Sequence, residues 1–246
     1  MSKGKKRLRI VIIAIVSAII ILLGGFYIYT LDYYRADEAA TQLLTADYVT
    51  ELKDGLTLIA PQSTLNEPIG LIFYPGGKVE ASAYLPLLDQ LSQRGYTCIL
   101  VKMPFNLAVF GINAADKVFD RFPEIQTWYF AGHSLGGAMA SSYAGSHTQR
   151  IEGLILLGAY PINDATIPTL AIYGSEDVKL DTTKLRSGDM NIELVGGNHA
   201  QFGNYGKQDG DGTATITRES QQAQAVEAIV SFIQETQALK GTTVEP

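Results

Sequence analysis

The feature of this chain that most constrains its fold is a series of short apolar runs with helical segments between them. The runs lie at residues 69–74, 97–103, 127–132, 153–159, 169–174 and 191–196. They lack the strict alternation of a half-exposed strand, so we expect both faces of each strand to be buried. Segments of helical character lie at 81–94, 114–122, 134–146 and 218–237, with a shorter one near Thr182. This order predicts an α/β fold built on a doubly wound, mostly parallel sheet.

Two short extended segments on either side of Gly55 precede these runs. They cover residues 48–52 and 56–60 and predict a β-hairpin. The chain has 246 residues, 46% of them hydrophobic, which is enough for one substantial core. We therefore expect a single catalytic-sized domain.

The N-terminal region contains a long apolar segment. Residues 10–29 carry no charge and predict a helix of roughly 30 Å, which matches the hydrocarbon thickness of a bilayer. The run ends in aromatic residues, as membrane spans do at the interface. It is longer than the roughly 7 to 15 apolar residues of a secretory signal peptide. These features favour an uncleaved membrane anchor over the alternative, a cleaved signal on a secreted protein.

Charge is distributed unevenly along the chain. Five basic residues lie within segment 1–9, and the rest of the chain carries a formal charge of −11. The positive-inside rule places the basic segment in the cytoplasm and the chain after Leu31 outside. An acidic body argues against a nucleic-acid partner. The expected parts are a cytoplasmic segment 1–9, a transmembrane helix 10–29, a juxtamembrane spacer 30–47, a folded domain 48–240 and a C-terminal tail 241–246.

The segment "GHSLGG", residues 132–137, stands where a predicted strand meets a predicted helix. At such a junction the pattern Gly-x-Ser-x-Gly places a serine hydroxyl on a sharp turn, where larger side chains at the two glycines would meet neighbouring backbone. A serine becomes nucleophilic when a base removes its proton. Ser134 is therefore the candidate nucleophile, and a glycine-rich helix start is the alternative interpretation.

Of the three histidines, one is placed where the base should lie. His133 is the neighbour of Ser134 and must point away from it, and His147 ends the helix that starts at Ser134, roughly 20 Å along its axis. His199 follows the last predicted strand, on a loop at a carboxyl end. We predict that His199 is the general base, against the alternative of an ordinary surface histidine.

An acid that orients the histidine should lie between the serine and the histidine in chain order. Asp177 follows directly after the strand at 169–174 and is the preferred candidate. Glu176 and Asp164 remain the alternatives.

The loop "FYPGGKVE" offers backbone donors for a developing negative charge. We expect an oxyanion hole from the N–H of Leu135, the residue after the nucleophile, and the N–H of Gly77 or Lys78. A phosphate-binding P-loop is excluded because Val79 stands where the motif needs serine or threonine.

The segments "YPGGK", "GHSLGG", "YGSED" and "GGNHAQFG", in this order, resemble the α/β-hydrolase superfamily, above all its compact, lidless members similar to dienelactone hydrolase. The resemblance covers about residues 69–233 and implies Ser134 as nucleophile, Asp177 as acid and His199 as base. The chain departs from the family pattern in two places. Dienelactone hydrolase has cysteine where Ser134 stands, and "PGGK" replaces the "HGGG" of lipases.

Only nine residues, 160–168, separate two predicted strands at the point where many relatives insert a lid. We expect an open site walled by segments 103–111 and 203–216, with Phe105, Phe110 and Phe202 as candidates for an apolar pocket. Asp209 and Asp211 resemble part of a calcium loop, but the remaining ligands are missing. No metal and no cofactor are therefore expected.

Together these features predict a membrane-anchored serine hydrolase that cleaves a carboxylic ester, a thioester or an activated amide through an acyl-enzyme. The expected partners are a small-molecule or envelope-derived acyl substrate and the lipid bilayer, through residues 10–29. The alternatives are an acyltransferase and a non-catalytic binding module of the cell envelope.

Overall fold

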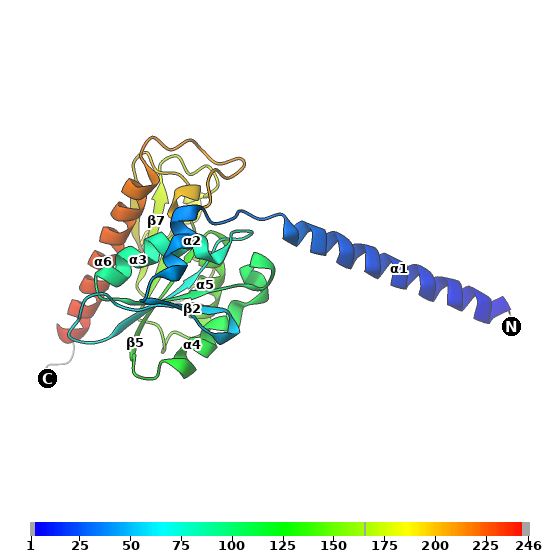
Figure 1. Ribbon diagram of the computed structural model, residues 1–246, viewed down its shortest axis with the longest axis horizontal. Helices are drawn as coiled ribbons and strands as arrows, with labels where there is room; N and C mark the ends of the chain where they lie inside the picture. The colour runs from blue at the N-terminus through cyan, green and yellow to red at the C-terminus, as the bar shows by residue number, and fades with distance from the viewer. Residues whose placement is uncertain (1–2, 165, 243–246) are drawn as a thin grey trace. The chain divides into compact units, whose positions relative to one another are not determined.

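The computed structural model describes residues 3–164 and 166–242, and the chain divides into two compact units, Met1–Tyr33 and Tyr34–Pro246 (Figure 1). The first unit is the helix α1 (Lys3–Leu31). Its stretch Gly4–Leu31 is long and apolar enough to cross a membrane, and none of its most apolar window is buried inside the protein. A candidate membrane span therefore stands where the sequence predicted one, and the helix extends beyond 10–29 at both ends.

The second unit is built on one eight-stranded sheet in the order β1-β2-β4-β3-β5-β6-β7-β8. The strands are β1 (Val49–Glu51), β2 (Leu56–Ile59), β3 (Ile69–Tyr74), β4 (Thr97–Val101), β5 (Thr127–His133), β6 (Gly153–Leu157), β7 (Thr169–Gly174) and β8 (Met190–Leu194). Strands β1 and β2 form the predicted antiparallel hairpin, and β2 also pairs antiparallel with β4. All remaining pairs are parallel, which confirms the predicted mostly parallel sheet.

The helices of this unit are α2 (Glu38–Gln42), α3 (Leu85–Gln93), α4 (Asp116–Arg121), α5 (Leu135–Ser146) and α6 (Arg218–Thr242). After β3 the chain places β4 on one side of it and β5 on the other. The strand order therefore reverses at β3, and ligands of open α/β sheets bind beyond the carboxyl ends of the strands at such a point.

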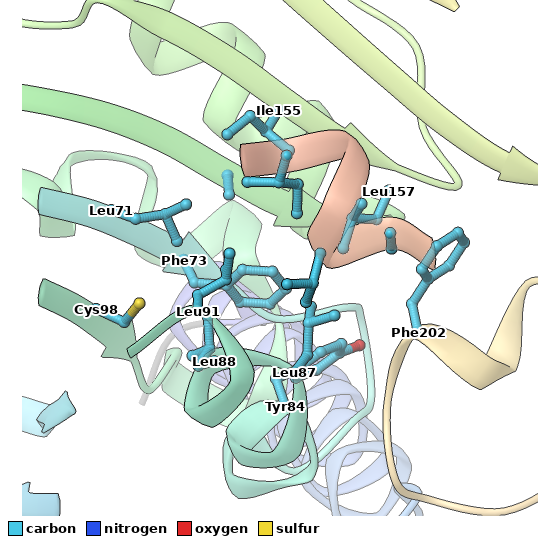
Figure 2. Packing of buried hydrophobic residues seen from close by; sticks show 14 of the residues in the cluster. Leu71, Phe73, Tyr84, Leu87, Leu88, Leu91, Cys98, Ile155, Leu157 and Phe202 are labelled. Atoms are coloured by element: carbon cyan, nitrogen blue, oxygen red, sulfur yellow. The ribbon is translucent and has the colours of Figure 1, made fainter. Parts of the chain in front are cut away.

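Two apolar clusters cover the two faces of the sheet. Along β3, Leu71 and Phe73 belong to the cluster that contains residues of α3 and α6, whereas Ile72 and Tyr74 belong to the cluster with residues of α4 and α5. Figure 2 shows the first cluster, in which side chains of β3, β6 and α3 gather around Phe73. Burial on both faces explains why the strand sequences are continuously apolar.

The structure corrects the predicted spacer at 30–47. Asp37 caps α2 by accepting the N–H of Ala40 at 3.0 Å, and Ala40 is completely buried. Tyr34 pairs with Val79 in a β-bridge. The folded body therefore begins at Tyr34. The sequence did not show this boundary, because a short amphipathic segment carries too little periodicity to indicate where it packs. At the other end α6 runs to Thr242, and the rest of the predicted tail lies outside the described residues.

The central strand β6 contributes Ile155, a fully buried member of the first cluster. Replacing Ile155 with alanine should lower the free energy of unfolding by about 2–5 kcal/mol, because the lost methyl groups leave a cavity. Denaturant titration of the full chain in detergent measures this, with Val195→Ala, at a side chain that is 75% exposed, as the control. Equal stability losses in the two variants would contradict the placement of Ile155 in the core.

Candidate active site

Ser134 occupies the sharp corner between β5, which ends at His133, and α5, which begins at Leu135. Its φ of 52° and ψ of −122° lie in a region that non-glycine residues rarely adopt, at a cost of about 1–3 kcal/mol. The N–H of Ser134 donates to the carbonyl of Leu157 at 2.9 Å, which ties the corner to β6. The surrounding structure thus holds one serine in a strained conformation at the carboxyl end of the sheet.

The two glycines of the motif let backbones approach closely around this corner. A Cβ at Gly136 would lie 2.2 Å from the carbonyl oxygen of Tyr74, and one at Gly132 would lie 2.6 Å from the carbonyl carbon of Gly136. Both distances are far shorter than real side-chain contacts. The structure therefore confirms the steric reason that the sequence analysis gave for glycine at these positions.

The structure brings His199 and Asp177 into direct contact. The imidazole Nδ1 lies 2.8 Å from Oδ2 of Asp177, and both side chains are almost completely buried. The other carboxylate oxygen accepts the N–H groups of Lys179 and Leu180 at 2.9 and 3.1 Å. Because these bonds orient the carboxylate, the Nδ1 atom of His199 faces a fixed acceptor and carries the proton.

Of the two alternative acids, neither takes this position. The carboxylate of Glu176 accepts the hydroxyl of Ser175 at 3.1 Å, and Asp164 is exposed. Gly158, after β6, leaves space for the side chains of His199 and Asp177. A Cβ there would lie 2.8 Å from Nδ1 of His199 and 3.1 Å from Oδ2 of Asp177, and the backbone has a φ of +53°.

The backbone of His199 is held on both sides as well. Its N–H and that of Ala200 donate to the two carboxylate oxygens of Asp211 at 3.3 and 2.8 Å. Its carbonyl accepts a hydrogen bond from Nε2 of His133 at 3.0 Å. Asp211, which the sequence analysis weighed only as a calcium ligand, thus anchors the turn that presents His199.

His133 belongs to a buried hydrogen-bond chain that fixes its tautomer. Since the carbonyl of His199 can only accept, Nε2 of His133 carries the proton and Nδ1 accepts from the hydroxyl of Tyr84 at 2.7 Å. That hydroxyl accepts the N–H of Gly76 at 3.0 Å. These hydrogen bonds thus connect the loop after β3, through the residue next to Ser134, to the backbone of His199.

Ser134 and His199 line the same cavity, whose volume is about 280 Å³. Within residues 3–164 and 166–242, the buried Nε2 of His199 has no hydrogen-bond partner. The cavity therefore combines a serine with a histidine whose Nε2 is unpaired in the described chain and whose Nδ1, at the other edge of the ring, is bonded to a carboxylate.

Of the three expected oxyanion donors, two have an N–H without a partner in the described chain and one does not. Leu135 is the first residue of α5, so its N–H has no partner within the helix. The N–H of Gly77 forms no hydrogen bond in the described chain, and a Cβ on Gly77 would lie 2.8 Å from the side chain of Leu135. The N–H of Lys78, by contrast, donates to the carbonyl of Asn106 at 2.7 Å. Lys78 was the wrong choice of the two, because this bond already uses its donor.

The predicted pocket residues do not line the cavity at Ser134. Phe202 is completely buried and packs against the ring of His133. Phe105 and Phe110 form an edge-to-face pair, each about half exposed, and Phe110 lines a separate hollow. Phe202 thus serves packing, whereas Phe105 and Phe110 pair at the surface, and hydrophobicity alone does not distinguish such positions from ligand contact.

The walls of the cavity come from other segments. Besides Ser134 and His199, its lining consists of Leu135, Ala138, Gly158, Ala159, Tyr160, Ile162, Lys179 and Leu180. The short segment after β6 is tied to α5, because the Ser141 hydroxyl accepts the N–H of Ile162 at 3.0 Å and the Ser141 carbonyl accepts the side chain of Asn163. The sequence showed that this segment is too short for a lid, but not that it forms a wall.

Comparison with known proteins decides the family. A model of the Alpha/beta hydrolase family matches residues 70–223, which is well over half of the chain. The chain belongs to the alpha/beta hydrolase family. This confirms the resemblance seen in its motifs.

Among solved structures, this hydrolase resembles a monoglyceride lipase from Saccharomyces cerevisiae, with a TM-score of 0.55 and 13% identity over 78% of this chain and 97% of that one. It also resembles a dienelactone hydrolase from Anabaena variabilis, with a TM-score of 0.52 and 15% identity over 74% of this chain and 95% of that one. At these identities the likeness shows the fold alone.

A sequence relative is a protein of Mycobacterium phage D29 that is named for a non-heme haloperoxidase activity. It is 30% identical over 107 residues, which are 39% of this chain and 38% of that protein. The hydrolase thus spans well under half of this relative.

Burial and the nearby ring of His199 lower the pKa of His133 well below its ordinary value. The folded hydrolase then keeps His133 neutral at pH values where the unfolded chain binds a proton. Its folding stability should fall as the pH drops below about 6.5, by up to about 1.4 kcal/mol per pH unit for this group. Unfolding free energies measured between pH 5 and 8 should show a shallower dependence for His133→Gln, and parallel curves for variant and wild type would contradict the assignment.

Proposed function

We propose that this protein is a membrane-anchored serine hydrolase that cleaves a carboxylic ester, or a thioester or activated amide, through an acyl-enzyme. One observation carries the proposal. His199 is bonded through Nδ1 to the buried carboxylate of Asp177, its Nε2 has no partner in the described chain, and His199 and Ser134 line one cavity. A histidine with an unpaired ring nitrogen, on the same cavity as a strained serine, supplies the groups that acyl transfer to that serine requires.

In the first step the Oγ of Ser134 attacks the ester carbonyl, and its proton passes to Nε2 of His199. The carbon–oxygen bond to the leaving group then breaks, and the alcohol departs with the proton from Nε2. In the second step a water molecule gives its proton to Nε2 and attacks the acyl-serine. The proton returns to Ser134 as the acid product leaves.

Asp177 stabilises the imidazolium that forms in each step and keeps the ring in the tautomer with Nδ1–H. The N–H groups of Leu135 and Gly77 would stabilise the negative oxygen of the tetrahedral intermediate. Leu135 also stands at the N-terminus of α5, a helix of twelve residues, so the partial positive charge of the helix end favours the same oxygen. No metal is needed in this chemistry.

The size and lining of the cavity support a small substrate group near Ser134. Its volume of about 280 Å³ lies at the lower end for small-molecule sites, which are roughly 300–1,000 Å³. Most of the lining side chains are apolar, and Lys179 is the charged one. A short acyl or alcohol group fits this description. The two structural neighbours named as a hydrolase and a lipase lend support from the fold.

Replacing Ser134 with alanine should abolish covalent labelling by a fluorophosphonate probe and lower ester hydrolysis by about 10³-fold or more, since the nucleophile is lost. Probe labelling on the full chain in detergent, and turnover of a series of p-nitrophenyl esters, measure the two effects. Ser146→Ala, at an exposed serine of the same helix, is the matched control.

Labelling that persists in Ser134→Ala would exclude the nucleophile assignment. A wild-type chain that neither labels nor turns over any ester would instead favour a binding module. Acyl transfer to an added alcohol in preference to water would favour an acyltransferase.

We further propose that α1 anchors the domain outside the cytoplasmic membrane. Its apolar length and the five basic residues of segment 1–9 support this orientation.

Protease added to intact cells should therefore remove a C-terminal epitope tag, while a cytoplasmic marker protein survives as the control. Protection of the tag until the cells are permeabilised would contradict this orientation. A mature chain that begins after residue 29 and is released into the medium would indicate a cleaved signal.

A further inference from the structure

Four residues at the start of the folded body, 34–37, contact loops on two sides of the candidate site. We call this segment the strap. It begins three residues after Leu31, the last residue of α1. The first loop, residues 75–80 after β3, contains Gly77 and is called the oxyanion loop. The second, residues 198–212 after β8, contains His199 and Asp211 and is called the histidine loop.

The backbone of Tyr34 pairs with the oxyanion loop. Its N–H donates to the carbonyl of Lys78 at 2.8 Å, and its carbonyl accepts the N–H of Glu80 at 2.9 Å. The carboxylate of Glu80 in turn accepts the N–H of Ala36 at 3.0 Å. These three bonds join the strap to Lys78 and Glu80, one and three residues after Gly77, whose N–H would contact the oxyanion.

The side chain of Tyr34 reaches the histidine loop. Its hydroxyl accepts the N–H of Asp209 at 3.0 Å, and its ring packs against that of Tyr205 at 5.6 Å between centroids. Asp209 lies two residues before Asp211, whose carboxylate holds the N–H groups of His199 and Ala200. One residue of the strap therefore spans the distance between the two loops.

Asp37 adds a second connection to the same loop. Its N–H donates to the carbonyl of Asn204 at 2.8 Å. Its carboxylate accepts the side chain of Asn204 at 3.2 Å and pairs with the guanidinium of Arg218, at the start of α6, at 2.6 Å. The strap is thus fixed at both ends, and its position depends on both loops together.

We propose that Tyr34 is a positioning residue for catalysis. By bonding the oxyanion loop through its backbone and the histidine loop through its hydroxyl, it sets the distance between the oxyanion donor at Gly77 and the base His199. This inference rests on the proposed function and extends it. The segment that leads out of the anchor then forms part of the catalytic apparatus as well as a tether.

A purely structural role for Tyr34 makes a different prediction. Loss of a packing or stabilising contact lowers the fraction of folded enzyme, or changes substrate binding, without altering the chemical step of the folded molecules. Loss of a positioning contact lowers kcat with KM unchanged, because the lost contact supports the alignment of the reacting groups in the transition state and not the binding of the substrate. It also acts through Asp211, so the effects of changing the two residues should not be independent.

The test uses the full chain in detergent, with p-nitrophenyl esters and fluorophosphonate labelling as readouts. Tyr34→Phe removes only the hydroxyl and should lower kcat and the labelling rate about five- to tenfold, the loss expected for one hydrogen bond. KM should stay within about twofold. Tyr48→Phe, at a partly buried tyrosine that precedes β1 and lies outside both loops, is the matched control and should retain wild-type values.

A double-mutant cycle completes the test. Asp211→Asn should lower kcat on its own, and adding Tyr34→Phe should lower it little further, because both changes loosen the same hold on His199. Equal behaviour of Tyr34→Phe and Tyr48→Phe, a change in KM alone, or losses that multiply in the double variant would each overturn the proposal. If Tyr34→Phe does not fold, Asp37→Asn is measured with the same readouts and the same expectations.

Failure of this inference is distinguishable from failure of the proposed function. If the wild-type chain is active and Ser134→Ala is not, the proposed function stands, whatever Tyr34→Phe shows. If Ser134→Ala keeps its activity, the proposed serine-hydrolase mechanism is refuted, and there is no longer a reason to assign Tyr34 a positioning role in catalysis.

Discussion

The close packing of α5 onto the ends of β3 and β5 is the constraint on which the rest of the site depends. A side chain at Gly136 would meet the backbone of Tyr74, so the helix approaches the sheet only because this position is glycine. That approach forces Ser134 into its strained conformation and brings the start of α5 beside Gly77. The proposed nucleophile, the positive end of the helix and the loop after β3 therefore take their positions from one steric condition.

The proposed base, His199, is positioned by a different principle. No single contact fixes His199. Its ring is bonded to Asp177, its N–H to Asp211 and its carbonyl to His133. Three partners from three segments leave the residue little freedom, and Nε2 is the ring nitrogen without a partner in the described chain. Orientation by several hydrogen bonds is how a protein holds a catalytic group close to its working geometry.

The sequence predicted those parts of the structure that depend on local pattern and chain order. Continuous apolar runs indicated the parallel sheet, and the glycines around Ser134 indicated the sharp turn. Chain order placed Asp177 and His199 on loops at one edge of the sheet, where the structure joins them. The resemblance to α/β-hydrolases followed from these same segments, and the family match agrees with it.

What the sequence did not predict depends on contacts between distant segments. Phe202 has an aromatic side chain of the kind that lines apolar pockets, but the fold buries it against the ring of His133. Lys78 and Gly77 are equivalent donors in the sequence, and only the position of Asn106 separates them. The docking of Tyr34 and Asp37 needs partners 44 to 181 residues away, which no local pattern records.

The short segment that walls the cavity has a consequence for substrate range. Ile162 and Asn163 are bonded to Ser141 of α5, the helix that begins directly after Ser134, so the wall and the proposed nucleophile are attached to the same helix. The segment cannot swing outward to admit a bulkier molecule without disturbing the helix that begins at the nucleophile. Evolution toward larger substrates would therefore proceed by trimming the side chains of Tyr160 and Ile162, and selectivity at this wall becomes a matter of side-chain volume.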